Sequence, residues 1–171
     1  MDAIQNLLKR RSVRQYTSQQ VPEALLDQVL EAGAFAPSGM NSQVSIMVAV
    51  TDKETRDQLS RMNAAVMGAD SDPFYGAPCV VVVLADPERY TWVEDASLVM
   101  GNLMNAAHAV GLGSCWIHRA REMFDSEEGK ALLKKWGLSE TLRGVGNCIL
   151  GYPQEIPAAR ERKTDRIVKI G

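Results

Sequence analysis

The apolar segment APCVVVVLAD at residues 77–86 constrains the fold more than any other feature of this chain. It is short, rich in β-branched residues and bounded by Pro78 and Pro87, a pattern typical of a β-strand. The run is also too short to cross a bilayer as a helix. The chain is therefore expected to build a sheet around this strand.

Apolar periodicity and cap signals predict the other elements. Asp2 and Asp52 stand where helix N-caps are expected, and Pro22 occupies a first-turn position. We expect helices near residues 2–8, 22–36, 52–62, 94–113 and 126–136, a buried strand at 44–51, and further strands at 114–118, 144–153 and 166–170. This order predicts one domain, residues 1–171, with helices packed on a central sheet.

Composition excludes several classes of protein. The chain has 171 residues, of which 46% are hydrophobic and 23% charged, as in an ordinary soluble globular domain. Its pI near 5.7 argues against a general nucleic-acid binder, which would be basic over much of its surface. Cys79, Cys115 and Cys148 lie far apart in apolar runs, so we expect buried free thiols in a reducing compartment. Because the first residues form a basic amphipathic segment and not a secretory signal, the expected location is the cytoplasm.

Two basic clusters lie at opposite ends of this acidic chain. The N-terminal cluster holds Lys9, Arg10, Arg11 and Arg14, and the C-terminal cluster holds Arg160, Arg162, Lys163, Arg166 and Lys169. By itself the N-terminal cluster fits equally well as cations at a helix C-terminus, where the helix dipole favours them. The presence of a second cluster favours a shared phosphate site, since the guanidinium fork matches phosphate oxygens. Ser12 adds a hydroxyl donor between the arginines.

The polar stretch at 154–171 follows the last long strand that we predict. It has few apolar residues, so we do not expect it to fold back on its own core. Tails of this kind often lie across a partner subunit.

Two further segments place polar groups on tight turns. AFAPSGMNSQ (34–43) is most simply a helix stop followed by a turn, although Ser38, Asn41 and Gln43 could also bind the polar edge of a heterocycle. GLGSCWIH (111–118) lacks the full GxGxxG pattern and follows a helix, which argues against a Rossmann phosphate turn. It predicts a bend where backbone can approach a flat ligand closely.

The usual machinery of hydrolysis is missing from the sequence. With only His108 and His118, and without HExxH or Cys/His spacing, no metal site is expected. GxSxG and GxxxxGK[ST] are absent as well, and His108, in an apolar helix, is expected to be structural. An enzyme with so few acid–base groups leaves the chemistry to a cofactor. We therefore expect no catalytic side chain.

Taken together, three segments resemble the nitroreductase family of FMN-dependent oxidoreductases. RRSVRQY (10–16) resembles that family's N-terminal arginine–serine motif, APSGMNSQ (36–43) its Ala-Pro-Ser-x-x-Asn-x-Gln loop, and NLMNAAHAVGLGSCWI (102–117) its central helix and following turn. FYGAP (74–78) and RKTDRIV (162–168) also fit, so the resemblance covers nearly the whole chain in order. It implies an α+β fold with a central mixed, largely antiparallel sheet flanked by helices. It also implies a homodimer in which residues 154–171 are exchanged between subunits.

The resemblance also implies roles for particular residues. Arg10, Arg11, Ser12 and Arg14 would hold the FMN phosphate and ribityl chain, with Arg162 and Lys163 closing on the same phosphate. Trp116, Ile117 and His118 would lie beside the isoalloxazine ring, where a backbone N–H, that of His118 being one candidate, meets flavin N5. The residues expected to reach a flavin held mainly by the other subunit are Pro37, Ser38, Asn41 and Gln43.

The implied activity is hydride transfer from NADH or NADPH, through FMN, to a small acceptor such as a nitroaromatic or quinone. The mechanism would be ping-pong, because donor and acceptor would use the same place over the flavin in turn. Two alternatives within flavoproteins stay open: a relative with a special task, such as dehalogenation or flavin breakdown, and a non-catalytic flavin-binding protein. Outside flavoproteins, the alternative is an anion-binding module whose basic termini meet an acidic partner. Neither nucleic acid nor membrane is an expected partner.

Overall fold

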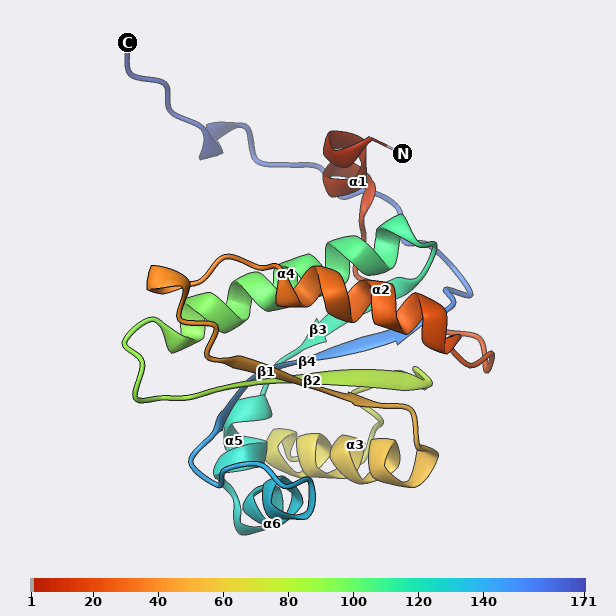
Figure 1. Ribbon diagram of the computed structural model, residues 1–171. Coiled ribbons are helices and arrows are strands. Elements are labelled where there is room, and N and C mark those ends of the chain that lie inside the picture. Colours follow the sequence, from red (N-terminus) through yellow and green to blue (C-terminus); the bar gives the residue numbers. More distant parts are fainter. Residues whose placement is uncertain (1) are drawn as a thin grey trace.

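The computed structural model describes residues 2–171 and shows a four-stranded antiparallel sheet with helices on both faces (Figure 1). Strand order is β1-β2-β4-β3. The strands are β1 (Ser45–Val50), β2 (Cys79–Ala85), β3 (Gly113–Ile117) and β4 (Arg143–Gly151). The helices are α1 (Ala3–Lys9), α2 (Glu23–Ala34), α3 (Lys53–Met67), α4 (Trp92–Ala109), α5 (Ala120–Asp125) and α6 (Glu127–Lys135). Short 3-10 turns occupy Gly39–Asn41 and Thr164–Arg166. The α+β class is confirmed.

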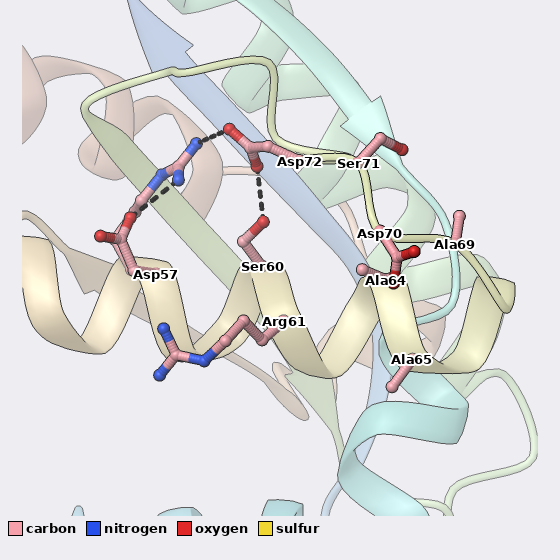
Figure 2. Close-up of a pocket in the computed structure, with 10 residues that line it drawn as sticks. Asp57, Ser60, Arg61, Ala64, Ala65, Ala69, Asp70, Ser71 and Asp72 are labelled. Atoms are coloured by element: carbon pink, nitrogen blue, oxygen red, sulfur yellow. Dashed lines mark hydrogen bonds and ion pairs between the residues drawn. The ribbon is translucent and has the colours of Figure 1, made fainter.

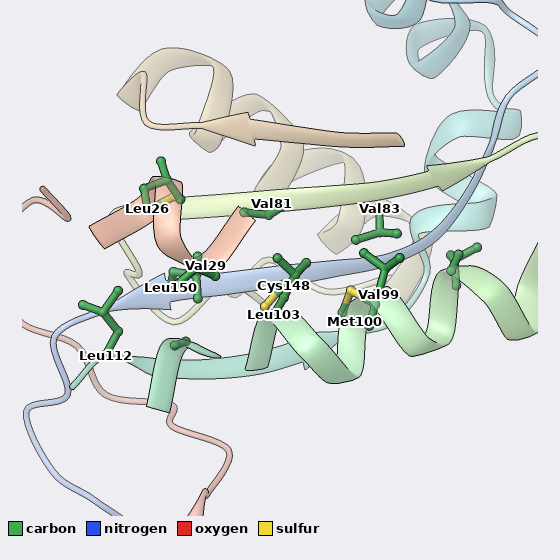
Figure 3. Close-up of a cluster of buried hydrophobic side chains, with 14 of the residues drawn as sticks. Leu26, Val29, Val81, Val83, Val99, Met100, Leu103, Leu112, Cys148 and Leu150 are labelled. Carbon is green, nitrogen blue, oxygen red and sulfur yellow. The ribbon is translucent and has the colours of Figure 1, made fainter. Parts of the chain in front are cut away.

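Strand β2 is the centre of the molecule, as its sequence predicts. All seven of its residues are buried, because successive side chains point to opposite faces and both faces are covered. Val81 and Val83 enter a core shared with α2 and α4, whereas Val80 and Val82 enter a second core with α3, α5 and α6. Figure 1 shows α2 and α4 on one side of the sheet and α3, α5 and α6 on the other. Figure 3 shows Leu26 of α2 and helix α4 over the first core.

Local chemistry sets several helix ends. The carboxylates of Asp2 and Asp52 accept hydrogen bonds from the backbone N–H of Gln5 and Thr55, at 2.9 and 2.8 Å, so both predicted N-caps are confirmed. Gly68 ends α3 in a left-handed conformation. Helix α3 therefore runs five residues beyond the predicted end at Met62, to Met67.

Some sequence predictions are wrong. Strand β1 is half-buried and not buried, because it is an edge strand that pairs only with β2. Residues 166–170 form no strand: Arg166 ends a 3-10 turn, and all five residues are exposed, since no strand within residues 2–171 lies beside them. The short helix α5 was not predicted, and the helix expected over 94–113 ends at Ala109, so that Gly113 opens β3.

The N-terminal segment closes the β3 edge of the sheet. Ser12 forms a parallel bridge with Ser114, and the N–H of Val13 donates to the carbonyl of Ser114 at 2.9 Å. This approach requires glycine at 113, because a Cβ there would lie 2.9–3.0 Å from the Val13 side chain. The parallel bridge is the mixed element of an otherwise antiparallel sheet.

Both ends of the chain lie on the same side of the molecule (Figure 1). The C-terminal tail runs from β4 past α1 and then away from the body. Its residues 154–171 are all exposed, and its apolar members Ile156, Ile167, Val168 and Ile170 are 62–95% exposed. Helix α1 also leaves its apolar stripe of Ile4, Leu7 and Leu8 exposed. The single chain thus has an apolar surface at this end that its own core does not cover.

Candidate functional site

The two basic clusters of the sequence meet in one pocket. Its volume is about 330 Å³, and its lining residues are Arg10, Arg11, Ser12, Arg14, Pro157, Ala158, Arg160 and Arg162. The bridge between Ser12 and Ser114 fixes one wall, and the tail supplies the other. The five arginines of this lining and the Ser12 hydroxyl form a site for a strongly anionic group.

Arg10 and Arg11 use their guanidinium groups differently. The Arg11 Nη1 atom donates to the carbonyls of Leu8 and Arg10, both at 2.8 Å, so it caps the end of α1. The Arg10 Nη1 atom is buried and has no hydrogen-bond partner among residues 2–171. The helix-end interpretation therefore holds for Arg11, while Arg10 is a buried donor that a phosphate oxygen would satisfy.

A second pocket of about 340 Å³ adjoins the basic pocket, because Arg14 lines both. The Arg14 guanidinium lies 5.9 Å from the centre of the Tyr75 ring. Aromatic and apolar side chains make up much of the wall, which consists of Arg14, Met67, Ser71, Asp72, Pro73, Tyr75, Trp116, Ile117, His118 and Arg119. The structure thus brings Trp116, Ile117 and His118 next to the basic cluster, and the pocket suits a flat aromatic ligand.

Backbone groups at the end of β3 face this second pocket. The Ser114 carbonyl points toward the N-terminal segment and away from β4. Because backbone groups of alternate residues point to the same edge of a strand, those of Trp116 face that edge too. The N-terminal segment bridges β3 at Ser114, and the part of the same strand edge at Trp116 borders the second pocket.

The loop at residues 37–43 lies apart from both pockets. Pro37, Ser38 and Gln43 line a separate cavity of about 130 Å³ together with Asp95. Asn41 is exposed, and its Oδ1 atom accepts from Gln43 Nε2 at 3.0 Å. Within one chain, therefore, the predicted site residues do not all come together.

The C-terminal cluster is brought to the pocket only in part. Arg162 lines it, but the exposed Lys163 does not. Arg160, which the sequence predicts as part of the C-terminal basic cluster but to which the family resemblance gives no role, is a lining residue. Its proximity to Arg162 along the sequence is the one signal that could have identified it.

The remaining titratable candidates are not arranged for catalysis. Burial raises the pKa of the Cys79 thiol to about 12 and also raises the pKa of Cys115 and Cys148, so none is a ready nucleophile. All three thiols are free and buried, as predicted. Burial lowers the pKa of His108, and the charges of Arg10, Arg11 and Lys9 lower it further.

A hollow larger than these two pockets lies elsewhere, along α3 (Figure 2). It measures about 550 Å³ and is floored by Ala64 and Ala65. Its buried Arg56 is already paired with Asp57 and Asp72, at 2.9 and 2.6 Å. Because it contains none of the predicted site residues and its buried Arg56 already has two carboxylate partners, we do not place the chemistry there.

Within residues 2–171, no group of three or more His, Cys, Asp or Glu side chains is placed to hold a metal ion. No helix in this part of the chain is both long and apolar enough to cross a membrane.

Comparison with known proteins decides the family. A family model described as Nitroreductase family matches residues 7–152. The chain belongs to the nitroreductase family. This member is 42% identical over 193 residues to an NADH dehydrogenase of Thermus thermophilus, covering 91% of this chain and 88% of the relative.

Two other relatives of this nitroreductase-family chain carry names that mention FMN. A Bacillus subtilis protein named FMN reductase (NAD(P)H) is 25% identical over 178 residues, covering 94% of this chain and 70% of the relative. The crystal structure of a nitroreductase with bound FMN from Bacteroides fragilis has a TM-score of 0.92 and 28% identity, with both chains fully covered. The predicted family and fold class are both confirmed.

Proposed function

We propose that this protein is an FMN-dependent oxidoreductase that takes electrons from NADH or NADPH and delivers them to a small acceptor such as a nitroaromatic or quinone. The observation that carries the proposal is the pocket where the two termini bring their arginines together around the buried, unpartnered Arg10 Nη1. A family member of similar structure binds FMN.

The residues of the basic pocket fit the phosphate of FMN. An unsatisfied buried guanidinium nitrogen is costly unless an anion meets it, and a phosphate supplies acceptor oxygens on several sides. Ser12 would donate its hydroxyl, and Arg160 and Arg162 would close the site from the tail. Lys163 does not line the pocket, so its side chain would have to turn inward to contact the phosphate.

The adjoining pocket fits the ring system. FMN, when bound, supplies the hydride-accepting and electron-donating chemistry that the side chains lack. The backbone at Trp116 and His118 would offer a donor to a ring nitrogen, and Tyr75 with Arg14 would border the same space. No side chain needs to act as a nucleophile or general base, in agreement with the raised pKa of Cys79.

A homodimer would complete the site. Pro37, Ser38, Asn41 and Gln43 lie away from the basic pocket of their own chain, so they would meet the cofactor of a partner. The exposed apolar residues of α1 and the tail would supply the interface. Neither contribution is available within a single subunit.

Absorption spectroscopy tests the proposal directly. Purified protein mixed with FMN and passed through a desalting column should stay yellow and bleach when NADH or NADPH is added without oxygen. Adding a quinone or nitroaromatic should restore the colour. A protein that retains no FMN under these conditions does not hold FMN as a bound cofactor, which would overturn the proposal.

One relative favours a second candidate function. Because the Bacillus subtilis relative is named FMN reductase, FMN could be a substrate that is turned over and released. In that case the protein would not retain FMN on the column, yet NAD(P)H oxidation would rise with added free FMN. A protein that retains FMN but oxidises no NAD(P)H with any acceptor would instead be a flavin-binding protein.

A further inference from the structure

Non-glycine residues with a left-handed backbone are concentrated in three short segments of the described chain. Within residues 2–171 they are Met40, Asn41, Gln43, Tyr75 and Arg119. Such conformations are strained for residues with a Cβ and persist only where the surroundings enforce them. Tyr75 and the turn after His118 border the pocket that the proposed function assigns to the flavin ring, and the 37–43 loop is the segment that it assigns to the cofactor of a partner subunit.

The loop at Gly39–Gln43 is the most strained of the three segments. Met40, Asn41 and Gln43 have φ values of 53°, 54° and 49°. The Met40 side chain is 91% exposed, so its own packing cannot hold this backbone in place. Some group outside the loop must therefore stabilise it.

Asp95, in the first turn of α4, is that group. Its side chain is buried, and the residue is only 4% exposed. Its Oδ1 atom accepts from the N–H of Gly39 at 2.8 Å, and its Oδ2 atom accepts from the hydroxyl of Ser42 at 3.2 Å. The hydroxyl of Thr91 donates to the same Oδ2 atom at 2.9 Å. One carboxylate thus fastens both ends of the strained turn to α4.

The neighbourhood of Gly39 tightens this clamp. Its carbonyl accepts from Arg89 Nη2 at 3.2 Å, and a Cβ at position 39 would lie 2.6 Å from the Thr91 hydroxyl. The loop therefore rests directly on the start of α4. Burial opposes the ionisation of Asp95, but the donors from Gly39, Thr91 and Ser42 outweigh it and hold its pKa below the ordinary value.

The other two segments are built in the same way. Asp72 accepts from the backbone N–H of Phe74 and Gly76, at 2.9 and 2.7 Å, on either side of Tyr75. The fully buried Asn63 accepts from Arg119 Nε at 3.1 Å and donates to the His118 carbonyl at 2.7 Å. Each strained segment thus has one polar side chain that holds it: Asp72 acts from within its own loop, and Asn63 acts from α3.

We infer that Asp95 is a positioning residue whose buried carboxylate holds the Gly39–Gln43 loop in the strained form that presents Ser38, Asn41 and Gln43 to the cofactor. The role in cofactor binding rests on the proposed function, whereas the role in ordering the loop does not. The two roles are therefore tested separately.

Hydrogen exchange of the FMN-free protein tests the ordering of the loop. We expect Asp95→Ala to raise exchange at the Gly39 and Gln43 amides at least tenfold, because Gly39 loses its acceptor and the turn relaxes. Asp52→Ala is the matched control: it also removes a carboxylate that accepts two hydrogen bonds near a helix start, but at α3. Unchanged exchange at residues 39–43 in Asp95→Ala would overturn the proposal.

FMN titration of the full-length protein tests the link to binding. We expect Asp95→Ala to weaken FMN binding about tenfold and to alter the visible circular dichroism of bound FMN, while Asp52→Ala stays within about twofold of the wild type. Adding Met40→Gly to Asp95→Ala should recover at least threefold in affinity, because glycine adopts positive φ without steric cost. In the wild-type background Met40→Gly should change affinity less than twofold.

The outcomes separate the two proposals. If the wild type binds no FMN but Asp95→Ala still loosens the loop, the proposed function fails and the clamp stands. If the wild type binds FMN and Asp95→Ala binds it equally well with the same circular dichroism, the positioning role fails. If Asp95→Ala loses affinity and Met40→Gly does not recover it, the strain argument is wrong. The loss would then come from a general defect in α4, which a substitution at an exposed loop residue does not repair.

Discussion

Strand β4 and the tail that follows it are continuous in sequence but differ in every structural respect. From Gly144 to Gly151 every strand residue is buried, and the strand pairs with β2 on one side and β3 on the other. From residue 154 onward every residue is exposed, including four large aliphatic ones. The strand is buried between other strands of its own chain. The tail is held at its start, where the N–H of Gln154 donates to the carbonyl of Gln15 at 2.9 Å, and it stays exposed beyond that point.

The difference shows that the folded body and the anion pocket depend on different parts of the chain. The body is stabilised by two cores on either side of β2. The pocket needs Arg160 and Arg162, which belong to a segment that this body does not hold in place by burial. Cofactor and partner subunit are the two groups that we propose to hold the tail, and the predictions below separate its contribution from that of the body.

The largest effect is expected in the body. Leu84→Ala empties part of the core around a fully buried side chain and should lower the free energy of unfolding by about 2–5 kcal/mol. Ile167 lies in the tail and is 78% exposed, so Ile167→Ala should change the free energy of unfolding of the isolated subunit by less than about 0.5 kcal/mol. Urea denaturation at low protein concentration measures both, and equal losses would contradict the distinction between body and tail.

Removing residues 154–171 should leave the body folded but weaken FMN binding by about 100-fold or more. Two arginines leave the pocket, and a hydrogen bond to a charged group contributes about 1.5–3 kcal/mol. Far-ultraviolet circular dichroism follows the body, FMN fluorescence quenching follows binding, and light scattering should report monomer or aggregate. A yellow, stable dimer after the deletion would show that the tail embraces neither cofactor nor partner.

Arg10→Gln should weaken FMN binding by about 10- to 100-fold, from the same 1.5–3 kcal/mol for a charged hydrogen bond. Without FMN the same variant should be as stable as the wild type or more so, because it removes an unpartnered buried cation. Lys9→Gln is the control on the exposed side of the cluster and should change neither property. A loss of stability in FMN-free Arg10→Gln would mean that Arg10 serves the fold.

The smallest effect concerns acid stability. Although burial opposes ionisation of Asp72, the donors from Arg56, Ser60, Gly76 and Phe74 lower its pKa below the ordinary value of 3.8. A lowered folded pKa contributes stability that is present above pH 3.8 and is lost as the pH falls through the folded pKa. Asp72→Asn should therefore flatten this loss, by less than about 1 kcal/mol because the side chain is 37% exposed. Thermal melts between pH 3 and pH 6 would measure it, with Asp165→Asn in the tail as the control.

Sequence reasoning succeeded where the signal is local. Each signal that it used correctly depends on residues close in sequence. These signals are the β-branched run of β2, the carboxylate caps of α1 and α3, and the two arginine clusters. It failed at 166–170 because a strand needs a partner strand, and none of the strands in the described part of the chain lies beside that segment. The burial of β1 was overestimated for a related reason, since an apolar strand at the edge of a sheet has the same composition as a central one.

The polar groups that hold the site were harder to identify. Asp95 stands in an apparently ordinary acidic first turn of a helix, and nothing local indicates that it accepts from Gly39, far earlier in the chain. Asn63 likewise lies in a helix whose sequence is largely polar, yet its side chain is fully buried and donates to the His118 carbonyl. Such roles depend on tertiary contacts, so a single sequence carries little trace of them.

The convergence of both termini on one side of the molecule has a practical consequence for handling the protein. A purification tag or fusion partner at either end would extend from the side of the molecule that carries the arginine pocket and would hinder the tail from closing on its ligand. The turn after α6 lies on the opposite side of the sheet, and Gly137 there already adopts a left-handed backbone with open space around its Cβ position. An insertion at residues 137–140 is therefore the better place for a reporter or an immobilisation handle.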